Sequence, residues 1–119
     1  MAQILIAGND WAARALLRAQ LIEEGLEVEA YENVPELVKR LWVGGDMPSL
    51  LVADLCDSED RGGDIATLSH WGKLLPIWIL VGQGVAEAED LDGQGFERVL
   101  IRPLDLGKLV QEIKERLAE

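Results

Sequence analysis

The chain has a single cysteine, Cys56, so no disulfide can form within it. No apolar run is long enough to cross a bilayer as a helix, and the first residues lack the basic and apolar pattern of a secretory signal. Proteins without disulfides or targeting segments are typical of a reducing compartment. The sequence therefore predicts a cytoplasmic protein.

Basic residues are also scarce. Eleven Lys and Arg stand against 22 Asp and Glu, which gives a formal net charge of −11 over 119 residues. This charge repels phosphate backbones and anionic lipid head groups, so we expect neither a nucleic-acid nor a membrane partner. The length suits one domain that spans residues 1–119.

Side chains suited to nucleophilic or metal-assisted catalysis are few. His70 is the only histidine, so neither a histidine-assisted nucleophile nor a multi-histidine metal site can form within one chain. We interpret Cys56 as a small side chain that fills a loop. The acidic residues near it are interpreted as a solvated acidic loop: Asp57, Glu59, Asp60 and Asp64. The sequence does not predict an enzyme.

Apolar segments alternate with segments of helical spacing along the chain. The short apolar runs predict strands at 3–7, 26–31, 49–55, 76–82 and 98–101. The predicted helices are one that ends before Gly25, one capped by Asn33, one from about Asp64 to Trp71, a weak one over 85–93 and a last one capped by Asp105. Five strands that alternate with five helices indicate a doubly wound parallel α/β sheet in three layers.

Ligands of such sheets bind at the carboxyl ends of the strands. The residues found there after the first, third, fourth and fifth strands are Gly8, Asn9 and Asp10, then Asp54, then Val81 and Gly82, and finally Arg102 and Pro103. These residues form the candidate site.

Three segments together resemble the receiver domain of two-component response regulators. They are "LLVADL", "PIWILVG" and "GFERVLIRPLDLGKL", and the resemblance covers the whole chain. The basic residue followed by proline and a helix cap is its most diagnostic part. The resemblance implies a flavodoxin-like sheet with strand order 2-1-3-4-5 and a role in phosphorelay signal transduction, as in the chemotaxis regulators.

The resemblance also implies a metal and phosphoryl site. In that family Mg²⁺ is held by two adjacent acids, by the phosphoacceptor aspartate and by a backbone carbonyl two residues later. By position the acids fall on Gly8 and Asn9, the acceptor on Asp54 and the carbonyl on Cys56. The loss of two carboxylates removes ligands that Mg²⁺ prefers, although Asp10 and Asp57 nearby could compensate. We expect no cofactor, with Mg²⁺ bound by Asn9, Asp54 and the Cys56 carbonyl only under the alternative below.

Three further positions depart from the family's pattern. A phosphoryl-binding hydroxyl falls on Val81, the aromatic that follows the switch falls on Val99, and a lysine falls on Arg102. The two valines are stiff side chains without donors, so the usual switch is missing. The planar guanidinium of Arg102 is expected to form a bidentate pair with Asp54 without phosphate.

These substitutions favour a degenerate receiver that acts as a phosphorylation-independent protein-interaction module in signalling. The alternative is a divergent response regulator that is still phosphorylated on Asp54 with weak Mg²⁺ dependence. A third hypothesis is a small flavin-binding or enzymatic protein on the same fold. It lacks support because the glycine-containing segments do not show a phosphate-binding pattern.

The resemblance places the partner surface on helix four, strand five and helix five, here about 85–93, 99–101 and 103–117. We expect another signalling protein or a second copy of the chain to bind there. Trp11 follows the degenerate pocket directly and is expected to close over it.

Overall fold

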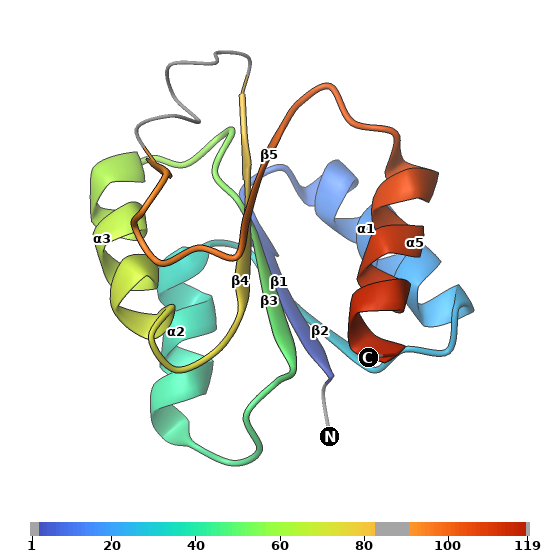
Figure 1. Ribbon diagram of the computed structural model, residues 1–119, viewed down its shortest axis with the longest axis horizontal. Helices are drawn as coiled ribbons and strands as arrows, with labels where there is room; N and C mark the ends of the chain where they lie inside the picture. The colour runs from blue at the N-terminus through green and yellow to red at the C-terminus, as the bar shows by residue number, and fades with distance from the viewer. Residues whose placement is uncertain (1–2, 83–90, 119) are drawn as a thin grey trace.

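The computed structural model describes residues 3–82 and 91–118, and these form one sheet flanked by helices (Figure 1). The elements are β1 (Ile4–Gly8), α1 (Trp11–Glu23), β2 (Val28–Tyr31), α2 (Val34–Val43), β3 (Leu50–Asp54), α3 (Arg61–Trp71), β4 (Ile77–Val81), β5 (Arg98–Ile101) and α5 (Leu106–Ala118). All neighbouring strands pair in parallel, in the order β2-β1-β3-β4-β5. The predicted fold class is confirmed, with four helices within the described ranges. Most of the fourth expected helix, 85–93, lies outside them.

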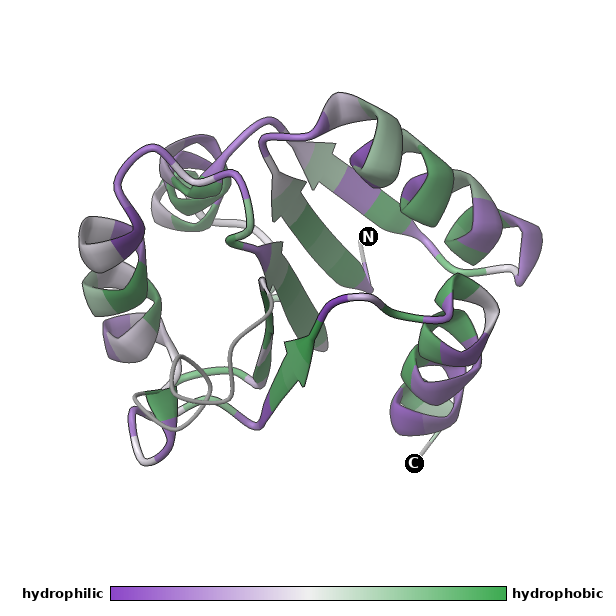
Figure 2. Cartoon of the chain, turned by 90° about the horizontal axis from the view of Figure 1, so that it is seen from above, coloured by the Kyte–Doolittle hydropathy of each residue, from purple (hydrophilic) through white to green (hydrophobic). Residues whose placement is uncertain are grey.

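The sheet separates two apolar cores. Helices α2 and α3 cover one face, and α1 and α5 cover the other, as Figures 1 and 2 show from two directions. Strands β1 and β4 are buried at every residue, whereas the outer strands β2 and β5 are half-buried. The continuous apolar runs of the sequence therefore form the central strands, because helices cover both faces of the sheet there. Among the described residues, no helix combines the length and the apolarity needed to cross a membrane.

Two helices begin at the N-cap residues that the sequence predicts, Asn33 and Asp105. The side-chain oxygen Oδ1 of Asn33 accepts a hydrogen bond from the Glu36 amide at 2.9 Å, which confirms this predicted cap. Likewise, Asp105 accepts from the Lys108 amide at 3.1 Å at the start of α5. Caps of this kind satisfy amides that have no partner inside a helix.

Helix α3 begins three residues before the predicted Asp64. Asp60 is its N-cap and accepts from the Gly63 amide at 3.1 Å. A Cβ on Gly63 would clash with the Asp60 carboxylate in its capping position, so glycine allows this cap to form. The interpretation of Asp64 as solvated is wrong, because it is buried and accepts a hydrogen bond from the Ser58 hydroxyl at 2.6 Å. Burial raises the pKa of the Asp64 carboxyl.

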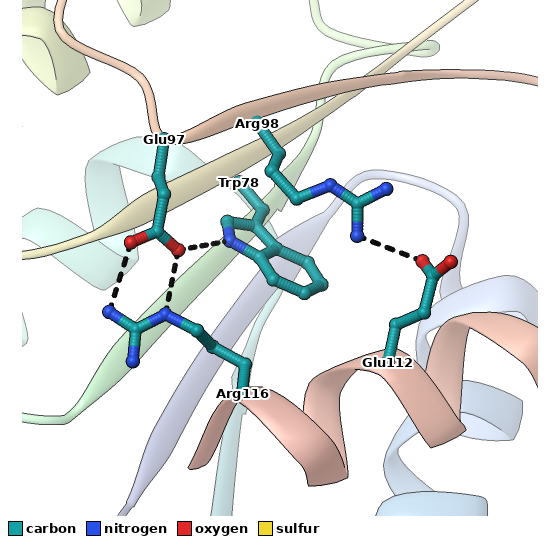
Figure 3. Close-up of polar contacts among 5 residues, drawn as sticks. All are labelled: Trp78, Glu97, Arg98, Glu112 and Arg116. Carbon is teal, nitrogen blue, oxygen red and sulfur yellow. Dashed lines mark hydrogen bonds and ion pairs between the residues drawn. The ribbon is translucent and has the colours of Figure 1, made fainter. Parts of the chain in front are cut away.

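A polar network ties α5 to the edge of the sheet (Figure 3). The buried indole of Trp78 on β4 donates to Glu97 at 2.7 Å, and Arg116 of α5 contacts both oxygens of the same carboxylate at 2.9 Å. The Arg98 guanidinium lies 4.7 Å from the centre of the Trp78 ring and pairs with Glu112 at 2.9 Å. These contacts hold α5 against β4 and β5, whose last residue leads into the candidate site.

Candidate functional site

The parallel register brings the predicted site residues to one edge of the sheet. Gly8 is the β1 partner of Asp54 on β3, and Arg102 follows the last residue of β5. A cavity of about 570 Å³ opens at this edge and continues between α1, the sheet and the segment that leads into α5. Five predicted site residues line it: Gly8, Asp54, Gly82, Arg102 and Pro103. Cys56 lines it as well, whereas Asn9 is exposed and lies outside the lining.

Asp54 is engaged through both carboxylate oxygens. Its Oδ2 lies 2.9 Å from Nη2 of Arg102, and its Oδ1 accepts a hydrogen bond from the Cys56 amide at 3.0 Å. The predicted pairing of Arg102 with Asp54 is present, but it joins one guanidinium nitrogen to one carboxylate oxygen and is not the bidentate pair that was expected. The Asp54 side chain is largely buried, at 16% exposure, so water screens this pair less than an exposed one.

Gly8 lies directly against the acceptor position. A Cβ built on Gly8 would lie 3.2 Å from Cβ of Asp54, which is tighter than ordinary packing. The glycine therefore allows close approach of β1 to Asp54, and it supplies no side-chain oxygen to the site.

Arg14 of α1 also lines the cavity, and the sequence analysis missed it. Its Nη1 donates to the Gly8 carbonyl at 2.5 Å, so a second guanidinium lies at the same edge. Arg14 precedes the buried Leu17 and Leu21 by three and seven residues, which places all three on one helix face. That spacing is the signal that would have pointed to it.

The two residues after Asn9 have structural roles. Asp10 is the N-cap of α1 and accepts from the amides of Ala12 and Ala13 at 3.0 and 3.2 Å. The expectation that Trp11 closes over the pocket is wrong, because the residue is 70% exposed and does not line the cavity. Trp11 begins α1, whereas the buried contacts of this helix begin at Leu17.

Neither a reactive thiol nor a hydroxyl is available at the carboxyl ends of β3 and β4. Burial and the hydrogen bond to Asp54 raise the pKa of the Cys56 thiol to about 11, so the thiol stays protonated and a poor nucleophile at neutral pH. Val81 is fully buried in the core under α2 and α3, and Val99 packs against the same core. These two positions therefore serve packing on the face of the sheet away from α5.

The residues present do not fit a Mg²⁺ ion of the kind that the fold implies. Mg²⁺ requires oxygen ligands in near-octahedral geometry. Gly8 offers no side-chain oxygen, the Asn9 side chain lies outside the cavity, and both oxygens of Asp54 have protein partners. In residues 3–82 and 91–118, His, Cys, Asp and Glu side chains do not gather in a group of three that could hold a metal.

Receiver domains of response regulators are among the solved structures that share this fold. A response regulator receiver domain from Clostridium thermocellum aligns over 99% of this chain and 95% of its own, with 18% identity and a TM-score of 0.81. A receiver protein from Pseudomonas putida covers 96% of both chains at 25% identity and a TM-score of 0.77. The response regulator TrrA from Thermotoga maritima, solved with Mg²⁺ and BeF, covers 98% and 99% at 21% identity, with a TM-score of 0.75.

Comparisons that use the sequence without the structure do not identify a family. No family model matches the sequence, and no curated protein matches it. The chain thus has the fold of response regulator receiver domains, as the sequence motifs indicated.

Proposed function

We propose that the chain is a single, atypical receiver domain that acts in signal transduction as a phosphorylation-independent protein-interaction module. The observation that supports this most is the ion pair between Asp54 and Arg102 at 2.9 Å. It occupies one oxygen of the carboxylate that would act as the nucleophile toward a phosphoryl donor, and the Cys56 amide occupies the other. Gly8, beside it in the register, provides no carboxylate to hold the metal that would stabilise the transferring phosphoryl group.

The interaction surface in this proposal is the face of β5 and α5, where another signalling protein or a second copy of the chain would bind. Ile101, the last residue of β5, leaves 36% of its surface exposed, which gives this face an apolar contact. The network around Glu97 and Arg116 keeps α5 in place against the sheet. A preorganised surface loses less conformational entropy when a partner binds. The remaining part of the predicted surface, 85–90, lies outside the described residues.

The test is a titration with Mg²⁺ and beryllofluoride, followed by amide NMR shifts. We expect no saturable shift of the Asp54 and Arg102 amides at concentrations that saturate a typical receiver, because the metal ligands are missing. Asp57→Ala is a matched control, since Asp57 is a loop acid that does not line the cavity. Saturable, Mg²⁺-dependent shifts that persist in Asp57→Ala and disappear in Asp54→Ala would replace this proposal by a divergent phosphorylated receiver.

A further inference from the structure

We propose that the cavity at the carboxyl edge of the sheet binds a small organic anion with an apolar body. Its walls come from three parts of the fold: α1, the central strands and the segment from β5 into α5. Such a cavity lies within the usual range for ligand sites, about 300–1,000 Å³. Binding of such an anion is independent of phosphoryl transfer, because it needs neither a metal nor a nucleophile.

The polar end of the cavity is cationic. Arg14 and Arg102 line it together with one acid, Asp54, so the three side chains sum to a charge of +1. The rest of the protein is strongly acidic, with a net charge of −11. The positive charge of the cavity therefore attracts an anion, whereas the acidic surface of the rest of the protein repels it.

Both guanidinium groups keep donors for a ligand. Nη1 of Arg14 donates to the Gly8 carbonyl, and Nη2 of Arg102 contacts Asp54. Each guanidinium carries five N–H donors in a rigid fork, so most of them are left for an oxyanion. Carboxylate and sulfonate oxygens match this geometry.

The remainder of the lining is apolar and defines the body of the ligand. Leu16 of α1 lines the cavity, although 53% of its surface is exposed. Leu104 lines it from the segment that leads into α5, Leu106 lines it from the first turn of α5, and Val52 and Leu80 line it from the sheet. Val52 and Leu80 are already buried, so an apolar body would remove surface of Leu16, Leu104 and Leu106 from water, at about 25 cal/mol per Å² of buried area. Inorganic phosphate could use the arginines but would leave this wall hydrated.

The experiment uses 8-anilinonaphthalene-1-sulfonate, an aromatic anion whose fluorescence rises in apolar surroundings, in buffer without Mg²⁺ or beryllofluoride. We expect saturable binding of one probe to the folded protein. Octanoate should displace it at a concentration at least about tenfold lower than octanol, because a charge-assisted hydrogen bond to Arg14 discriminates the two. Near-UV circular dichroism of each sample shows that the probe reports native protein.

Three variants make the test specific. Arg14→Met should weaken probe binding by about tenfold or more, whereas Arg18→Met, an exposed arginine on the same helix outside the cavity, should bind as the wild type does. Leu16→Trp should reduce binding by filling the cavity from a partly exposed position where folding tolerates a larger side chain. Absence of saturable binding, equal displacement by octanol, or wild-type affinity in Arg14→Met would each overturn the proposal. Because no phosphoryl mimic is present, these outcomes are independent of the phosphorylation test.

Discussion

Single side chains decide the chemistry at the carboxyl edge of the sheet. Gly8 and Asp54 are partners in the β1–β3 register, so the backbone brings position 8 to the acceptor whatever side chain it carries. Glycine there supplies no side-chain oxygen, and the guanidinium of Arg102 pairs with the Asp54 carboxylate. The fold alone does not fix the function, because the side chains at this edge determine its chemistry.

Glu97 is the residue whose replacement should most affect the contact between α5 and the sheet. Glu97→Leu leaves the buried indole N–H of Trp78 without its acceptor, so we expect a loss of about 1–3 kcal/mol in the free energy of unfolding. Glu97→Gln keeps a neutral acceptor and should lose less. Urea denaturation at neutral pH measures both, and equal stability of the two variants would contradict the role of the indole hydrogen bond.

The same residue predicts a pH dependence. Hydrogen bonds from Arg116 hold the pKa of the Glu97 carboxyl below its ordinary 4.5, with help from Trp78 and against the opposing effect of burial. A depressed pKa contributes stability that is complete above 4.5 and is lost as the pH falls through the pKa of the folded state. The difference in unfolding free energy between wild type and Glu97→Gln should therefore shrink below this pH. A difference that stays constant down to acid unfolding would show that the ion pair is not the cause.

Helix α1 allows a direct test of whether Asp10, the acid that follows β1, acts as a helix cap. Asp10 accepts from two amides at the start of α1. We expect Asp10→Ala to lower the free energy of unfolding by about 0.5–2 kcal/mol and Asp10→Asn to have a much smaller effect, because asparagine caps nearly as well. Urea denaturation distinguishes the two. If Asn destabilised as much as Ala, the charge and not the cap would be the function of Asp10.

The elements differ in how well their boundaries could be predicted. Asn33 and Asp105 capped the helices that they were expected to cap, because a cap is a local interaction over three residues. The start of α3 was missed because Gly62 and Gly63 are poor helix formers, whereas Gly63 allows the Asp60 cap to form. Arg14 was missed because its role depends on the Gly8 carbonyl, a backbone group in another element.

For the whole molecule, repulsion among its many acidic side chains predicts how salt changes the melting temperature. A net charge of −11 on a molecule with a Cα radius of gyration of 13.1 Å places many like charges within electrostatic range. Raising the ionic strength from about 0.01 M to about 0.1 M shortens the Debye length from about 30 Å to about 10 Å. The exposed ion pairs, such as Lys39–Glu36, contribute little that screening could remove. We therefore expect NaCl to raise the melting temperature.

Choline chloride is the control for this prediction, because a large organic cation screens charge without binding as a metal would. Both salts should raise the melting temperature equally at equal ionic strength. A fall in melting temperature would show that attractive pairs outweigh the repulsion among the 22 acids.

The order of residues was sufficient for the fold class, the strand positions and the identity of the side chains at the strand ends. Those features follow from local hydrophobic patterning and from the parallel topology that such patterning requires. The cavity, the exposure of Trp11 and the burial of Asp64 depended on packing between segments distant in the chain. Patterning shows that a side chain lies near an edge of the sheet, but whether it is covered depends on which helices pack there.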